Sequence, residues 1–159
     1  MGVRYVKTKF GTIFTRLLGS GVALNPLEIE VMHRLFDGLP LPIRAPAIEQ
    51  LELYNLVQRE YDGRALNFYR KVNGKVSLAD LPKLPIRPGE VVLLRMAFLL
   101  EGGGERFHAT MTAVNQRFFC MSFGSDTRPL VNRHIASVER VVDSWRSSLE
   151  VSAQQRAHE

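Results

Sequence analysis

Apolar side chains recur every three or four positions in NPLEIEVMHRLFD, residues 25–37, which is the spacing of one face of an α-helix. Asn25 is a good N-cap, Pro26 suits the first helical position, and Glu28 can complete a capping box with Asn25. Gly38 can supply a left-handed residue just beyond the last turn. The pattern therefore predicts a helix over residues 25–37.

A second short helix is expected to begin around Pro46. After it the period of the apolar positions changes to two, the period of a β-strand. The dipeptides DG at 62–63 and NG at 73–74 accept the positive φ angles of type I′ turns. They predict two tight hairpins in succession, as in a meander. In the first hairpin, Val57 is expected to pair with Phe68.

The strongest β region is VVLLRMAFLL, residues 91–100. It follows ADLPKLPIRPGE, residues 79–90, whose three prolines and four charged residues indicate an extended connector rather than a strand. Every second residue of this strand is apolar, and these residues share one side, which is expected to face a core. This set is Val92, Leu94, Met96, Phe98 and Leu100.

The segment RFHATMTAVNQRFFCMSF, residues 106–123, alternates as two strands joined by a turn at Asn115-Gln116. Val114 would then pair with Arg117, and Met111 with Cys120. The core side is expected to hold Phe107, Ala109, Met111, Ala113, Phe118, Cys120 and Ser122. The opposite side is expected to hold His108, Thr110, Thr112, Val114, Arg117, Phe119, Met121 and Phe123.

The C-terminal segment IASVERVVDSW, residues 135–145, fits a helix through Ile135, Val138, Val142 and Trp145. Its residues also alternate as a strand would. We favour a helix here, with a strand as the alternative.

Together these elements predict one α+β domain over residues 1–150, with a flexible tail over 151–159. One or two N-terminal helices would pack on a curved antiparallel meander sheet of about five to six strands, followed by a C-terminal helix or strand. In shape such a domain is similar to cystatin-like domains, a resemblance that carries no function with it.

Composition and charge indicate in which cellular compartment this domain is expected. No stretch approaches the roughly 20 apolar residues of a membrane span, and one cysteine cannot form an internal disulfide, so we expect a cytoplasmic protein. Residues 1–22 contain Arg4, Lys7, Lys9 and Arg16 and no acidic residue. This basic segment fits a solvated helix face, an organelle-targeting peptide or a peripheral membrane anchor.

Candidate chemistry is sparse. In the predicted register Cys120 points into the core while His108 points out of the opposite face, so the two cannot act as nucleophile and base. The four histidines and one cysteine show no ligand spacing, so we expect no metal and no cofactor. The chain is therefore not expected to be an enzyme, although a cavity enzyme of cystatin-like shape using His108, Glu60 or Tyr61 remains an alternative.

The unusual feature is the predicted outer face, which mixes aromatic, threonine and cationic side chains. Burying an aromatic side chain completely is favourable by about 1.5–3 kcal/mol, so we expect another part of this chain or a partner to cover these side chains. The cover could be Trp145 and the C-terminal segment, the N-terminal helix, a protein partner or a second copy in a homodimer. The expected partner-binding residues are Arg95, Leu99, His108, Thr110, Thr112, Arg117, Phe119, Met121 and Phe123.

The leading hypothesis is thus a non-enzymatic protein-binding module that uses its outer sheet face or hairpin edges. The alternative is a basic protein, with a net charge of +5, that binds nucleic acid or an anionic membrane. Tyr69 and the sheet phenylalanines could then stack on bases. The basic residues of this alternative are Arg4, Lys7, Lys9, Arg16, Arg70, Lys71 and Lys75, with Lys83 and Arg87 in the connector.

Overall fold

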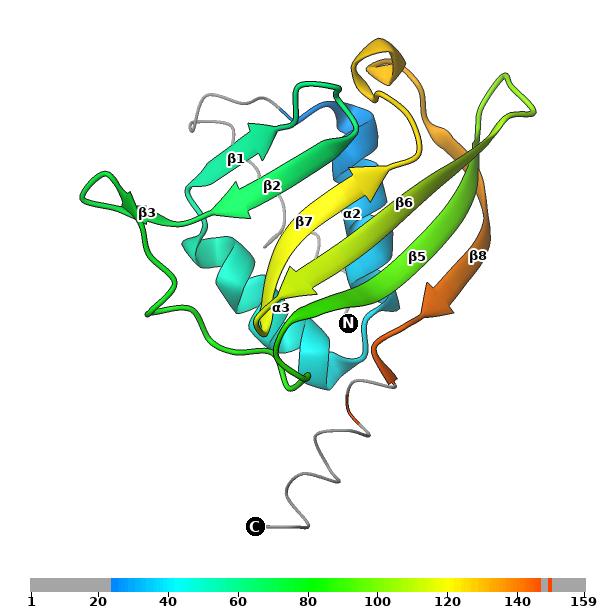
Figure 1. Ribbon diagram of the computed structural model, residues 1–159. Coiled ribbons are helices and arrows are strands. Elements are labelled where there is room, and N and C mark those ends of the chain that lie inside the picture. Colours follow the sequence, from blue (N-terminus) through cyan, green and yellow to red (C-terminus); the bar gives the residue numbers. More distant parts are fainter. Residues whose placement is uncertain (1–23, 147–148, 150–159) are drawn as a thin grey trace, which may run out of the picture.

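The computed structural model describes residues 24–146 and 149. In this part of the chain, two helices pack against the concave side of a curled, six-stranded antiparallel sheet, which has the form of a half-barrel (Figure 1). The predicted α+β class, the strand number and the cystatin-like shape are confirmed. The basic segment 1–22 and the tail 151–159 lie outside the described residues.

Helix α2 spans Pro26–Gly38 and begins as the sequence predicts. The Asn25 side chain accepts a hydrogen bond from the Glu28 amide, and the Glu28 carboxylate accepts one from the Asn25 amide, which completes the capping box. The predicted left-handed Gly38 is wrong. Gly38 belongs to the last turn, and the chain leaves the helix at Leu39 in an extended conformation.

Helix α3 spans Leu41–Leu53 and starts five residues before the predicted Pro46, which lies inside it. A proline in the second turn removes one backbone hydrogen bond, a defect of about 3 kcal/mol in a helix interior. Side chains at helical spacing offset this defect, because Ile43, Ala47 and Leu51 are fully buried. Tertiary packing therefore extends the helix beyond what propensity predicts.

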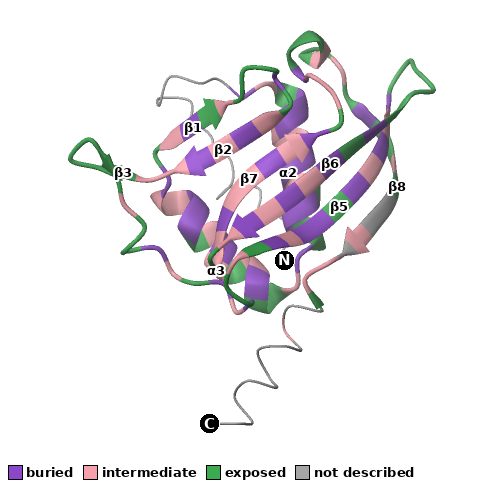
Figure 2. Cartoon of the chain, in the orientation of Figure 1, coloured by how far each residue is buried: buried purple, intermediate pink, exposed green. Residues whose placement is uncertain are grey.

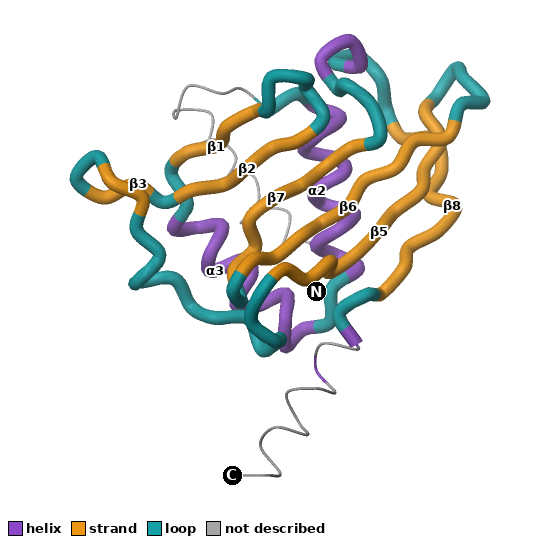
Figure 3. The backbone as a smooth tube through the Cα atoms, viewed as in Figure 1, coloured by secondary structure: helices purple, strands orange, loops and turns teal. Residues whose placement is uncertain are grey.

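The six-stranded sheet has the strand order β1-β2-β7-β6-β5-β8. Its strands are β1 (Leu56–Arg59), β2 (Ala65–Tyr69), β5 (Glu90–Leu100), β6 (Arg106–Val114), β7 (Arg117–Phe123) and β8 (Ile135–Asp143). Two further strands, β3 (Lys71–Val72) and β4 (Lys75–Val76), form a separate ribbon, visible beside the sheet in Figure 3. The second hairpin is therefore not part of a meander, because β2 pairs with β7 instead.

The predicted pairings hold in three hairpins, and the predicted type I′ turn holds in two of them. In the first hairpin only Gly63 has a positive φ, and β1 and β2 are joined by the longer loop 60–64, in which the Gly63 amide donates to the Glu60 carbonyl. Val57 pairs with Phe68 between β1 and β2, and Val114 pairs with Arg117 across the turn between β6 and β7. Positive φ angles at residues 73–74 and 115–116 match type I′ turns. Turn chemistry thus sets the register close to each loop.

Strand β5 departs from simple alternation at a β-bulge between Val92 and Leu94. The extra residue, Leu93, moves the inward-facing set by one position. As a result Val91 and Leu93 are buried, and Val92, which the alternation predicts to be buried, is only half-buried on the outer face. The rest of the predicted inward set beyond the bulge is confirmed.

Residues 135–143 form strand β8, so the favoured C-terminal helix is wrong and the strand alternative is correct. Strand β8 pairs with β5 along an edge that would otherwise leave its backbone groups unpaired. The apolar positions of this segment fit either a helix or a strand. The strand forms because it pairs the backbone N–H and C=O groups at the edge of β5.

Burial alternates along the strands in Figure 2. The buried side chains of the strands form one core cluster with those of α2 and α3. Among these side chains, the Phe118 ring contacts Phe36 from α2 at 5.4 Å and Phe68 from β2 at 4.9 Å between ring centroids. The core therefore lies between the helices and the concave side of the sheet, and the convex side is left for other contacts.

Candidate functional site

No described helix lies over the outer, convex face of the sheet (Figure 1). Trp145, which was expected as a possible cover, packs against the core cluster instead. The central outer face is made by side chains of β2, β5, β6 and β7. These are Asn67, Tyr69, Arg95, Ala97, Leu99, His108, Thr110, Thr112, Arg117, Phe119, Cys120 and Ser122.

A second β-bulge, in β7, decides which side chains reach this face. Ala113 pairs with Phe118, but Thr112 pairs with Cys120 rather than with Phe119. Phe119 is therefore an extra residue, and it lies half-buried on the outer side together with Cys120. The predicted pairing of Met111 with Cys120 is wrong by one residue.

The same bulge corrects two of the predicted partner-binding residues. Met121 is fully buried and Phe123 is 8% exposed, so both belong to the core and not to the outer face. Cys120 and Ser122, predicted to face the core, are half-buried on the outer side. The bulge shifts the alternation of β7, and this brings the larger apolar side chains inside.

The other predicted partner-binding residues share the outer face. Arg95 and His108 are exposed on neighbouring strands, and Leu99, Thr110, Thr112, Arg117 and Phe119 are half-buried around them. Tyr69, which the sequence suggested only for base stacking, joins them because its neighbours Leu66 and Phe68 point inward. Strict alternation in β2 was the signal that could have placed Tyr69 here.

Tyr69 and Phe119 form an aromatic pair on this face. Their ring centroids lie 5.4 Å apart, and the rings are nearly perpendicular, a favourable edge-to-face arrangement. At one margin of the face, Arg106 forms an ion pair with Glu139. The face thus combines a fixed aromatic pair with cationic and hydroxyl side chains.

Cys120 and His108 lie on the same face, contrary to the predicted register, but they do not meet. Cys120 pairs with Thr112, four residues from His108 along β6, a separation of about 13 Å at the rise of a strand. Burial, with smaller contributions from the charges of Glu60 and Glu90, raises the pKa of the Cys120 thiol to about 11. The thiol is therefore protonated at neutral pH and is a poor nucleophile.

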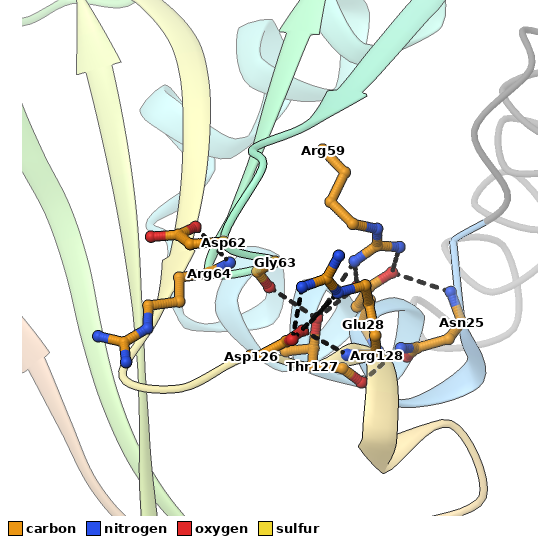
Figure 4. A network of polar contacts seen from close by, with 9 residues as sticks. All are labelled: Asn25, Glu28, Arg59, Asp62, Gly63, Arg64, Asp126, Thr127 and Arg128. Atoms are coloured by element: carbon orange, nitrogen blue, oxygen red, sulfur yellow. Dashed lines mark hydrogen bonds and ion pairs between the residues drawn. The ribbon is translucent and has the colours of Figure 1, made fainter.

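A polar cluster at the start of α2 is the other notable group of side chains (Figure 4). Glu28 is fully buried, and its carboxylate forms an ion pair with Arg59 of β1. The Thr127 hydroxyl donates a hydrogen bond of 2.7 Å to the same carboxylate, and the Asn25 side chain donates to the Thr127 carbonyl. Because each buried polar group has a partner, this cluster joins elements and offers no free group for chemistry.

Next to this cluster, Asp126 and Arg128 form an ion pair where the chain passes from β7 into the 3-10 helix η1 (Arg128–Leu130). The Arg128 guanidinium donates hydrogen bonds to the Asp126 carboxylate, which lowers the pKa of Asp126. A side chain at Gly63 would overlap the Asp126 carboxylate, and Gly63 has a φ of 73°. Only glycine fits this turn.

The remaining candidates for acid-base chemistry do not converge. Tyr61 is 98% exposed at the tip of the first hairpin, and Glu60 accepts a hydrogen bond from Asn67, while His108 lies on β6. Within residues 24–146 and 149, no group of three or more histidine, cysteine or acidic side chains could hold a metal ion. No helix in the same part of the chain is long and apolar enough to cross a membrane.

The predicted basic residues that the structure describes lie at the β3–β4 ribbon and in the connector that follows it. Lys71 and Lys75 are exposed on the β3–β4 ribbon, and Arg70 at its base forms an ion pair with Asp80 at 3.5 Å. Lys83 and Arg87 are exposed in the connector that follows. The other predicted basic residues, Arg4, Lys7, Lys9 and Arg16, lie outside the described residues.

No protein-family model, no curated protein and no solved structure matches this chain. The arrangement of its own side chains therefore carries the functional argument.

Proposed function

We propose that this chain is a non-enzymatic interaction domain that binds a protein, either a different chain or a second copy of itself, through the outer face of its sheet. The observation that carries the proposal is the Tyr69–Phe119 pair, which is half-buried on a face that no described helix covers. Covering an aromatic side chain completely is favourable by about 1.5–3 kcal/mol. A partner that covers both rings would gain part of this free energy.

The composition around the aromatic pair supports the same proposal. Arg117 lies two residues from Phe119 along β7, and Arg95 and His108 lie farther away on the same outer face. None of the six strands contains a lysine. Protein interfaces are enriched in tyrosine, phenylalanine and arginine and depleted of lysine. The β-bulge at Phe119 adds support, because bulges often re-aim side chains at sites of binding.

The proposal predicts that Phe119→Asp leaves a folded protein that binds its partner at least about tenfold more weakly, because hot-spot truncations cost about 2 kcal/mol or more. Thermal unfolding followed by circular dichroism tests the fold. Phe123→Asp, four positions along the same strand, is the contrasting variant. It is expected to unfold the protein, because Phe123 belongs to the core.

The partner itself can be trapped in the native host. A photo-crosslinking phenylalanine analogue at position 119 is expected to yield an adduct of discrete mass, and an adduct of twice the chain mass identifies a second copy. The same analogue at the exposed position Glu49 of α3 is the control and should yield none. An adduct at position 49 but not at 119, or unfolding of Phe119→Asp, would contradict the proposal.

A further inference from the structure

The positive charge of the described chain is concentrated in residues 70–89. This segment has five basic residues and one acidic residue, whereas residues 90–159 have eight of each, and residues 28–69 have four basic and seven acidic residues. The single acid, Asp80, is already paired with Arg70. The exposed cations that stay available for a partner are Lys71, Lys75, Lys83 and Arg87.

Residues 71–76, the β3–β4 ribbon, project from the side of the sheet (Figures 1 and 3). The base of the ribbon is nonetheless anchored. The Asn55 side chain accepts a hydrogen bond from the Lys71 amide at 2.7 Å and donates one to the Lys71 carbonyl at 2.8 Å. The Ser77 amide also donates to the Arg70 carbonyl. The ribbon is therefore presented in one orientation, which lowers the entropy lost on binding.

Aliphatic side chains are exposed on the same projection. Val72, Val76 and Leu78 are 39%, 54% and 45% exposed, and they make up half of the large apolar side chains exposed in the described residues. Val72 pairs with Lys75, and Val76 pairs with Lys71, so each face of the ribbon carries one valine and one lysine. Either face can place an aliphatic group and a cation on the same partner.

The chemistry of the segment discriminates between anionic partners. Residues 70–89 contain no aromatic residue, so they provide no platform for base stacking, which favours binding to single-stranded nucleic acid. Each strand of the ribbon has only two residues, too few for the main-chain hydrogen bonds of strand addition by a peptide. An anionic lipid surface can bind both kinds of side chain at once. Its headgroups attract the lysine ammonium groups, and the aliphatic side chains enter the interface beneath them.

We infer that the β3–β4 ribbon, with Leu78, binds the surface of anionic lipid bilayers. The two valines enter the interface, and Lys71 and Lys75 lie against the headgroups. Each lysine near an anionic surface contributes a modest attraction that salt screens. A single small anchor of this kind gives reversible binding that weakens as the salt concentration rises.

Co-sedimentation of the full chain with phosphatidylcholine vesicles, with and without phosphatidylserine, tests this inference. The wild type is expected to bind only the vesicles that contain phosphatidylserine, and less at high salt. Lys71→Glu/Lys75→Glu should weaken binding by at least about 30-fold, the effect of losing two such lysines, because the new carboxylates also repel the headgroups. Val72→Ser/Val76→Ser should weaken binding at unchanged net charge. All four side chains are exposed, so both variants are expected to fold.

Matched controls separate the ribbon from net charge and from general hydrophobicity. Arg34→Glu/Arg64→Glu changes the net charge by the same amount at exposed sites elsewhere, and Leu41→Ser/Val131→Ser removes two other exposed aliphatic groups. Both controls should bind within about threefold of the wild type. The inference is overturned if the wild type does not bind these vesicles, if the ribbon variants bind like the controls, or if the ribbon lysines are needed for single-stranded DNA and not for vesicles.

Discussion

The thiol of Cys120 lies half-buried on the outer face of the sheet, a position the sequence does not predict. Its expected inertness does not depend on that error. Burial and two nearby carboxylates raise its pKa to about 11, from an ordinary value of 9.0. The local environment therefore controls the reactivity of this side chain, whichever face it occupies.

Iodoacetamide labelling across pH tests this environment. At pH 8 the thiolate population of Cys120 should be about a hundredfold below that of a thiol with the ordinary pKa, so the folded chain should label at least about a hundredfold more slowly than the chain unfolded in urea. Labelling should rise with an inflection near pH 11. Because the folded state keeps its proton to a higher pH, the contribution of Cys120 to stability is lost as pH rises from about 9 to about 11. Cys120→Ser is the blank, and an inflection below pH 9 would contradict the assignment.

At the scale of elements, Glu28 acts in two ways. It completes the capping box of α2, which the sequence predicts from the spacing of Asn25 and Glu28. It also forms a buried ion pair with Arg59, 31 residues away, and accepts from Thr127, 99 residues away. The second role joins α2, β1 and the loop after β7, and no local spacing could reveal it.

Replacing Arg59 alone should destabilise the folded protein strongly. Arg59→Met leaves the buried Glu28 carboxylate without its ion-pair partner, and we expect it to lower the free energy of unfolding by about 3–5 kcal/mol in urea titrations. Glu28→Gln/Arg59→Met should recover much of that loss. The amide oxygen of the glutamine can still accept from the Asn25 amide, and its NH2 group can donate to the Thr127 hydroxyl, which then donates to the Gly63 carbonyl.

The control for this pair is Arg64→Met. Arg64 is exposed, and its side chain points away from the cluster in Figure 4. Its replacement should change stability by less than about 0.5 kcal/mol. Equal losses from Arg59→Met and Arg64→Met would show that the buried pair has no special role.

At the scale of the whole molecule, Gln50 connects three regions that are distant in the sequence. It is fully buried on α3, and its side-chain amide donates to the carbonyls of Pro82 and Gln116. Its carbonyl accepts from the Phe118 amide at 2.8 Å. One side chain thus holds the connector and the β6–β7 hairpin against the helix.

Gln50→Leu keeps a similar volume but removes all three hydrogen bonds. We expect a loss of about 3 kcal/mol or more in the free energy of unfolding, because buried backbone groups are left unpaired. Amide exchange should show lost protection at Phe118. Glu49→Leu, at an exposed neighbour on the same helix, is the control and should preserve both stability and protection. Unchanged exchange at Phe118 in Gln50→Leu would contradict this role.

Much of the fold follows from the sequence alone. The capping box at Asn25, the glycine and asparagine turns, and the alternation of residues 94–100 are local signals, because each depends on backbone geometry within a few residues. These signals predict the first helix, the hairpins, the α+β class and most of the outer face. They do not place Cys120 correctly relative to His108. The predicted register separates the two on opposite faces, whereas in the structure they share the outer face and are separated along the strands.

Only the tertiary structure decides the rest, because burial and pairing outweigh local preference. In FFCMSF, residues 118–123, strict alternation would bury Cys120 and Ser122, whereas one bulged residue buries Met121 and Phe123 instead. The free edge of β5 likewise makes residues 135–143 a strand rather than a helix. Both choices are made by partners distant in the sequence, which bury more apolar surface and pair more backbone groups than the locally preferred arrangement would.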